Sequence, residues 1–132
     1  MHFVPNVATA EVIWIGRPIR YHDAFKPDGT NVSFVQVVDQ HTIHVRTYER
    51  GVEEETLACG SGAIASALLA AAVQKVESPV TVVPLSQMPL TVTFRMKGDQ
   101  PEAGFVDVTL TGNALAVYEG LMRPAAWEDG RL

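Results

Sequence analysis

The stretch YERGVEEETLACGSG, residues 48–62, joins a strand-like run to a helical one and decides how the chain is organised. It is followed by AIASALLAAAVQ, residues 63–74, an alanine-rich run with high helix propensity. We therefore predict a helix from about Ser61 to Gln74 or Lys75. Apolar residues lie all round this helix, which indicates that it is buried on most sides.

The only cysteine, Cys59, stands directly before this helix and is followed by Gly60-Ser61-Gly62. Backbone N–H groups and the macrodipole at a helix N-terminus favour negative charge, so a thiolate is stabilised there. The same N–H groups can hold a carboxylate or a phosphate, and the glycines let a ligand approach closely. Taken alone, a buried structural cysteine is an equal alternative.

The rest of the chain predicts short strands around this helix, which is an α+β layout in a single domain, residues 1–122. In the strand at 42–49, Ile43, Val45 and Thr47 should share one face, and His44, Arg46 and Tyr48 the other. The predicted strands are 32–38, 42–49, 80–83, 89–96, 104–110 and 114–119.

Several loops and caps are also predicted. We expect Thr9 to cap a helix beginning near Ala10, and Gly16 and Pro18 to weaken or break that helix. Turns are expected at 26–29 (KPDG) and 111–113 (TGN), a flexible loop at 96–103 and a loosely held tail at 123–132.

The bulk composition excludes several classes of protein. The chain has 132 residues, 47% hydrophobic residues and a net charge of −5, with acidic and basic residues interspersed. This argues against a nucleic-acid partner, which would require clustered Lys and Arg. One cysteine excludes an intrachain disulfide, and no run reaches the length of a membrane span. We expect a soluble cytoplasmic protein without a signal peptide or a membrane partner.

The motif YERGV…ETLACGSGA resembles the catalytic motif in the C-terminal half of diaminopimelate epimerases. Thr30-Asn31-Val32 and the opening His2-Phe3-Val4 also match signatures of that family, in the same order. The resemblance runs from His2 to about Gly120 and covers only the second half of the family's usual chain. It implies an isomerase of lysine and peptidoglycan-precursor synthesis that interconverts LL- and meso-diaminopimelate with two cysteines and no cofactor.

The resemblance also implies roles for individual residues. Such an enzyme needs a base and an acid on opposite sides of the α-carbon. Cys59 would work on one face, while Gly60 and Ser61 would bind the substrate carboxylate through N–H donors. His2 would orient the thiol of Cys59.

Three further residues are implied to act at the same site. Glu49 would orient the second cysteine, which this chain lacks, and would also contact the substrate. Arg50 would bind the substrate through its planar guanidinium, and Asn31 would contact it too. Without the resemblance, Glu49 and Arg50 are typical of a solvated surface pair and Asn31 of a turn. The three glutamates at 53–55 are predicted to form a solvated bend.

Other chemistries are poorly supported. A pyridoxal-phosphate enzyme needs a Schiff-base lysine, but Lys26, Lys75 and Lys97 all have the character of surface residues. His41 and His44 would face opposite ways on a strand, so no metal site is predicted. Isomerases related to proline racemase or to phenazine biosynthesis rank second, because their residues around the glycine-rich turn differ.

The family's fold is a mostly antiparallel β-barrel lobe around a central helix, with two lobes in each enzyme. The resemblance therefore implies an incomplete barrel in this chain, with exposed strand edges that require a partner. We expect a homodimer that completes the sheets between subunits, or else a missing N-terminal half. The alternative function is that of a catalytically inactive truncated domain that serves binding or assembly.

Overall fold

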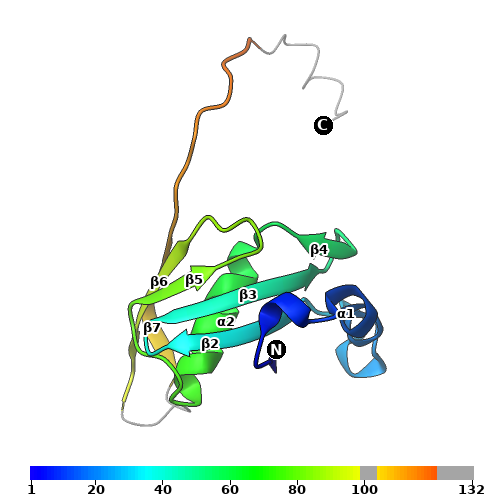
Figure 1. Ribbon diagram of the computed structural model, residues 1–132, viewed down its shortest axis with the longest axis horizontal. Coiled ribbons are helices and arrows are strands. Elements are labelled where there is room, and N and C mark those ends of the chain that lie inside the picture. The colour runs from blue at the N-terminus through cyan, green and yellow to red at the C-terminus, as the bar shows by residue number, and fades with distance from the viewer. Residues whose placement is uncertain (99–103, 122–132) are drawn as a thin grey trace.

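The computed structural model describes residues 1–98 and 104–121, and its α+β class confirms the prediction from sequence. Two α-helices and the strands form the folded part, and residues 112–121 follow it as an extended segment (Figure 1). In chain order the elements are β1 (His2–Phe3), η1 (Val7–Thr9), α1 (Val12–Arg20), η2 (Asp23–Phe25), β2 (Val32–Asp39), β3 (Thr42–Glu49), β4 (Glu54–Thr56), α2 (Gly60–Ala72), β5 (Val80–Val83), β6 (Leu90–Met96) and β7 (Phe105–Thr111).

All the strands form one mixed, seven-stranded sheet. Its order is β1-β2-β3-β5-β6-β7, and β4 also pairs with β3. One edge of β3 is shared, since Thr42–His44 pair with β5 and Thr47–Glu49 pair with β4. Within the described residues the sheet ends at β1 and β7 and does not close into a barrel, in line with the incomplete lobe that was expected.

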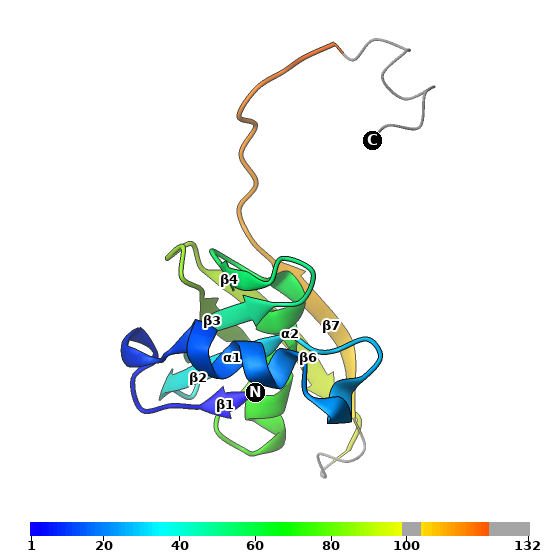
Figure 2. The same cartoon turned by 90° about the vertical axis from the view of Figure 1, so that its right-hand side faces the viewer.

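Helix α2 lies along one face of this sheet, and the strands curve around it (Figure 2). Its buried positions are small residues, including Ala63, Ala67 and Ala70, which let the helix backbone approach the strands closely. The sheet meets them with a layer of branched and aromatic side chains: Val35, Ile43, Val45, Val80, Val82, Val92 and Phe94. The alanine-rich run is therefore the central helix of the core, as predicted.

Helix α1 covers part of the opposite face, and it runs through both Gly16 and Pro18. The helix is not broken at these two residues, and nothing in its geometry tests whether they weaken it. Gly16 is needed at its position because a Cβ there would lie 2.7 Å from Cβ of the buried Tyr48. Pro18 cannot donate to the carbonyl of Trp14, but Trp14 is 81% exposed, so water can bond to that carbonyl instead.

The predicted cap at Thr9 was also wrong. Asn6 caps the short helix η1 with a hydrogen bond from Ala8 N–H to Asn6 Oδ1 of 2.9 Å. Thr9 is the last residue of η1, and its hydroxyl donates to the Asn6 carbonyl. The predicted helix itself, α1, begins at Val12, and its N-cap residue Glu11 makes no capping hydrogen bond through its side chain.

The predictions fail most clearly at the end of the described chain. No strand forms at 114–119, and no tight turn forms at 111–113, where Thr111 still belongs to β7. Residues 112–121 extend away from the sheet (Figures 1 and 2), and Leu115 and Tyr118 are 76% and 85% exposed. A strand needs a hydrogen-bonding partner, and the described residues offer none there.

Two predictions fall wholly or mostly outside the described residues. These are the loosely held tail at 123–132 and, beyond Gly98, the flexible loop at 96–103. Among the helices of residues 1–98 and 104–121, none has the length and apolar character that crossing a membrane requires.

Candidate functional site

Cys59 is the N-cap residue of α2. Its Sγ accepts a hydrogen bond from the N–H of Gly62 at 3.4 Å, and its carbonyl accepts from Ala63 N–H at 2.8 Å. The site is tight at Gly62, since a Cβ there would lie 3.1 Å from Thr47 Oγ1 and 3.2 Å from Cys59 Sγ. The sulfur is therefore held at the positive end of the helix dipole, where negative charge is stabilised.

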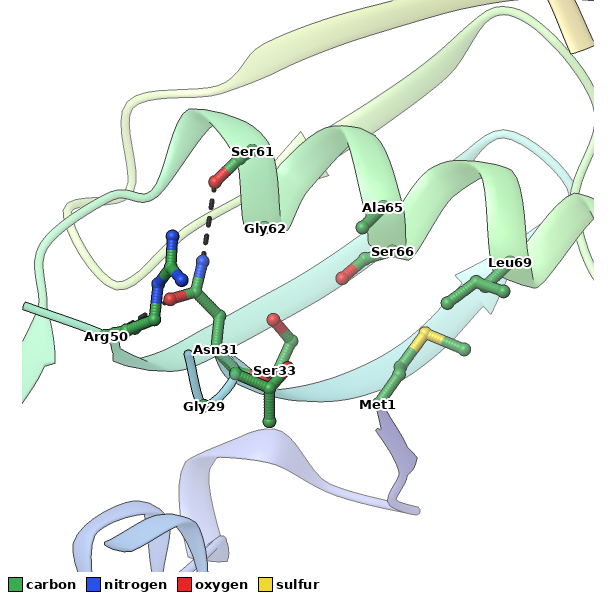
Figure 3. Close-up of a pocket in the computed structure, with 11 residues that line it drawn as sticks. Met1, Gly29, Asn31, Ser33, Arg50, Ser61, Gly62, Ala65, Ser66 and Leu69 are labelled. Carbon is green, nitrogen blue, oxygen red and sulfur yellow. Dashed lines mark hydrogen bonds between the residues drawn. The ribbon is translucent and has the colours of Figure 1, made fainter. Parts of the chain in front are cut away.

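Asn31 joins three separate segments at this point. Its Oδ1 accepts from the backbone N–H of Arg50 at 2.7 Å. Its Nδ2 donates to Ser61 Oγ at 3.4 Å (Figure 3) and to Cys59 Sγ at 3.7 Å. Asn31 directly precedes β2 and Arg50 directly follows β3, so the pairing of these strands brings both to the mouth of α2.

A cavity of about 360 Å³ opens beside Asn31 and Arg50. Its polar end carries the Arg50 side chain and the hydroxyl of Ser61, and farther along lies the buried hydroxyl of Ser66 (Figure 3). Met1 and Leu69 form an apolar part of the wall. A cation, an amide and several hydroxyls at one end suit an anionic, hydrogen-bonding ligand.

Glu49 is held from the neighbouring strand. Its Oε2 accepts a hydrogen bond from Thr56 Oγ1 at 2.8 Å, and it lies opposite Glu54 in the pairing of β3 with β4. The carboxylate is thus fixed at the end of β3, one residue before Arg50. Its role toward substrate stays a prediction.

His2 lies on the other face of the sheet. Its ring stacks on Phe34, with centroids 5.5 Å apart, and Phe34 packs in the cluster beneath α1. The residues on either side of His2 in the chain, Met1 and Phe3, point toward α2 instead. Met1 lines the cavity, and the Phe3 ring lies 5.3 Å from Lys75 Nζ. The structure therefore does not bring His2 to Cys59, and its assigned role stays a prediction.

The glutamates at 53–55 do not form the solvated bend that was predicted. Glu53 Oε1 accepts from Nε and Nη2 of Arg20 at 3.0 and 2.8 Å, and from Gly51 N–H at 3.1 Å. The Gly51 N–H, followed by Tyr21 and Arg20, lowers the pKa of Glu53 below its usual value. This carboxylate is an anchor of the turn that carries Arg50.

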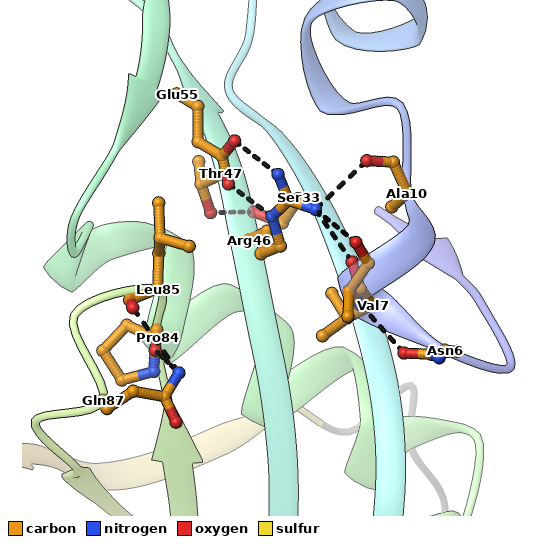
Figure 4. A network of polar contacts seen from close by, with 11 residues as sticks. Asn6, Val7, Ala10, Ser33, Arg46, Thr47, Glu55, Pro84, Leu85 and Gln87 are labelled. Carbon is orange, nitrogen blue, oxygen red and sulfur yellow. Dashed lines mark hydrogen bonds and ion pairs between the residues drawn. The ribbon is translucent and has the colours of Figure 1, made fainter.

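Glu55 is anchored as firmly, by Arg46. Their bidentate pair has distances of 2.5 Å from Nε to Oε1 and 2.6 Å from Nη2 to Oε2. The remaining nitrogen, Nη1, donates to the carbonyls of Val7, Ala8 and Ala10 (Figure 4). Neither ion pair was predicted, because a charge pattern along the chain does not show which residues of distant elements meet.

The identity of the chain follows from comparison with known proteins. Residues 1–110 match the model of a family described as diaminopimelate epimerase. The chain belongs to this family. The diaminopimelate epimerase of Aquifex aeolicus is 47% identical over 123 residues, which cover 90% of this chain and 42% of that protein.

Two further relatives give the same result. The diaminopimelate epimerases of Chlorobaculum tepidum and Archaeoglobus fulgidus are each 39% identical, over 119 and 128 residues. The matches cover 89% and 91% of this chain but only 44% and 41% of those proteins. The chain thus spans less than half the length of these curated relatives. The family resemblance stated from the sequence is confirmed.

Metal ligands are sparse around this site. In the part of the chain that the structure describes, no group of three or more His, Cys, Asp or Glu side chains could hold a metal ion. The polar groups gathered at the mouth of α2 are instead a thiol, an amide, a hydroxyl and a guanidinium.

Proposed function

We propose that this chain provides one catalytic face of a diaminopimelate epimerase, with Cys59 as the acid–base group. The observation that carries the proposal is the position of Asn31, which bonds to the backbone of Arg50 and to the side chains of Cys59 and Ser61. A reactive sulfur and groups that bind anions thereby come from three separate segments to one site.

The chemistry requires removal of a weakly acidic proton from the carbon between an ammonium and a carboxylate. We propose that the Cys59 thiolate takes this proton on one side, and that the N–H groups of Gly60 and Ser61 hold the carboxylate on which charge develops. The proton must return from the opposite side. Since the chain has a single cysteine, a group from outside this sequence must supply it.

The remaining site residues recognise the substrate in this proposal. Arg50 and Asn31 line the cavity and bind the second amino-acid end of diaminopimelate, with the guanidinium facing a carboxylate. Glu49, one residue before Arg50, contacts the substrate and orients the acid on the other face. His2 acts only if the N-terminal strand changes its position, because its ring now lies on the far face of the sheet.

The test uses protection of the Cys59 thiol, which needs no second cysteine. The rate of carbamidomethylation by iodoacetamide is measured with and without meso-diaminopimelate. We expect the rate to fall as the site is occupied, with weaker protection by lysine, which lacks the second carboxylate. Arg50→Gln should abolish this difference between the two ligands. Equal rates with and without diaminopimelate at millimolar concentration would overturn the proposal.

Turnover provides a second measurement. In heavy water, we expect this chain alone to exchange the α-proton of diaminopimelate far more slowly than the roughly 1–10³ per second that enzymes commonly reach. Exchange at such rates would show that one cysteine suffices and that the two-cysteine mechanism does not apply. Protection without exchange agrees with a site that has one catalytic face.

We further propose that the chain is cytoplasmic and assembles as a homodimer. The single cysteine supports the reducing compartment. The dimer is supported by the sheet edges at β1 and β7 and by apolar side chains that remain exposed on α2, with Leu69 48% and Val73 53% exposed. Uncovered strand edges and apolar helix faces recruit further chains.

A further inference from the structure

Arg50 stands in a tight turn that Glu53 closes in two ways. The backbone N–H of Glu53 donates to the carbonyl of Glu49 at 2.8 Å, and its Oε1 accepts from Gly51 N–H at 3.1 Å. Gly51 and Glu53 have positive φ angles of 90° and 62°. The path of the chain on either side of Arg50 therefore depends on the Glu53 backbone and carboxylate.

The same carboxylate binds Arg20, which comes from the end of α1. Arg20 Nη1 reaches the carbonyl oxygen of Asp28 at 3.4 Å, and Arg50 Nη1 lies at the same distance from that oxygen. Two guanidinium groups thus share one acceptor. Like charges this close repel each other, and the Glu53 carboxylate on Arg20 supplies the opposing charge.

Arg20 also packs directly beneath the loop that lines the cavity. A Cβ at Gly29 would lie 1.6 Å from Arg20 Nη1, and Gly29 itself lines the cavity next to Asn31. The Tyr21 ring lies 4.8 Å from the Arg20 guanidinium. The Arg20 side chain is only 13% exposed, so it has little freedom to move away from Arg50.

We propose that Glu53 is a positioning residue for Arg50: it closes the turn and compensates the charge of Arg20, so that the Arg50 guanidinium stays directed into the cavity that Asn31 and Ser61 line. This rests on the proposed function in one respect, namely that Arg50 faces an anionic ligand. Glu53 itself touches no ligand and acts through Arg50.

The test compares two reagents for the Cys59 thiol that differ in charge. Iodoacetate is an anion and iodoacetamide is neutral, so the ratio of their rates reports the positive potential at the sulfur. Arg50→Gln should lower this ratio, by about two- to fivefold for the loss of one unit charge at a partly exposed site. An unchanged ratio in Arg50→Gln would mean that Arg50 is not directed at Cys59, and the proposal fails.

Glu53→Gln separates positioning from a simple charge effect, because the two act in opposite directions. Removal of a negative charge alone raises the iodoacetate ratio, whereas displacement of Arg50 lowers it. We expect a fall toward the Arg50→Gln value. The matched control is Glu54→Gln, an exposed neighbour with the same change of charge, which should leave the ratio unchanged or slightly raised.

Glu53→Asp provides a second variant that keeps the charge and shortens the side chain. If Glu53 positions Arg50, the ratio of the iodoacetate rate to the iodoacetamide rate should fall in this variant too. If Glu53 acts only through its charge, the ratio should not change. A ratio equal to that of the unmodified chain therefore overturns the proposal. Because no substrate is present, the result does not depend on the epimerase proposal. A lowered ratio without protection by diaminopimelate means that Glu53 positions Arg50 for a different anion.

Discussion

Asn31 Nδ2 lies 3.7 Å from Cys59 Sγ, while Oδ1 of the same side chain accepts from the N–H of Arg50 at 2.7 Å. One amide therefore sets the distance between the turn after β3 and the N-cap residue of α2. A donor directed at sulfur stabilises a thiolate more than a thiol, because hydrogen bonds to charged acceptors are the stronger ones.

The first prediction compares Asn31, which the structure places at the thiol, with His2, to which the resemblance assigned the orienting of the thiol. Asn31→Ala should slow carbamidomethylation of Cys59 at neutral pH by about three- to tenfold, through loss of a donor to the thiolate. His2→Ala should leave the rate unchanged within about twofold, because its ring stacks on Phe34 on the far face. A larger effect from His2→Ala than from Asn31→Ala would contradict this geometry.

The second prediction concerns the packing of α1. Gly16→Ala gains about 1 kcal/mol of helix propensity but places a Cβ 2.7 Å from Cβ of Tyr48. Two Cβ atoms cannot move apart without moving their backbones, so the cost of the clash exceeds the gain in helix propensity. The free energy of unfolding should therefore fall by about 1–2 kcal/mol. Urea denaturation measures it. Trp14→Ala, on the exposed side of α1, is the control and should change stability by less than about 0.5 kcal/mol.

The third prediction follows from the lowered pKa of Glu53, which Gly51 N–H, Tyr21 and Arg20 cause in that order. A depressed carboxyl pKa contributes stability above the unfolded value and loses it as the pH falls through the folded pKa. The difference in unfolding free energy between the unmodified chain and Glu53→Gln should therefore be constant near neutral pH and shrink below about pH 4.5. Glu54→Gln is the matched control, and an equal pH dependence in both variants would refute the assignment to Glu53.

The fourth prediction concerns assembly. Sedimentation at micromolar concentration should detect a homodimer, because the edges of the sheet and the outer side of α2 are uncovered. Val73→Lys, at the C-cap of α2 and outside the lining of the cavity, should shift the chain toward monomer without loss of helix signal. If the unmodified chain sediments as a well-behaved monomer, the dimer proposal should be dropped.

The features predicted correctly from sequence depend on local signals. The alanine run places α2 within one residue at its start, and the β-branched and aromatic runs at 32–38 and 42–49 locate β2 and β3. The prediction that Ile43 and Val45 share one face and Tyr48 the other is confirmed by their separate clusters. Asn31, Arg50 and Ser61 line one cavity, while the roles that the resemblance implies for them toward a substrate stay predictions.

The features that were missed depend on contacts between distant segments. Arg20 and Glu53 are separated by 33 residues, and nothing along the chain indicates that the end of α1 reaches the turn after β3. Residues 114–119 have strand-like composition, but a strand also requires a partner, and in the described residues none lies beside them. The prediction for Gly16 used helix propensity alone. The structure shows that the close approach of Tyr48 leaves no room for a Cβ at this position.

The guanidinium of Arg46 has a consequence for local opening. It holds the carbonyls of Val7, Ala8 and Ala10 before α1 and, with its other nitrogens, the carboxylate of Glu55 in β4. If either segment moves away from β3, the Arg46 guanidinium loses hydrogen-bond acceptors, and the same guanidinium also binds the other segment. We therefore expect the amide hydrogens of η1 and β4 to exchange with solvent as one cooperative unit, although some forty residues of chain separate them.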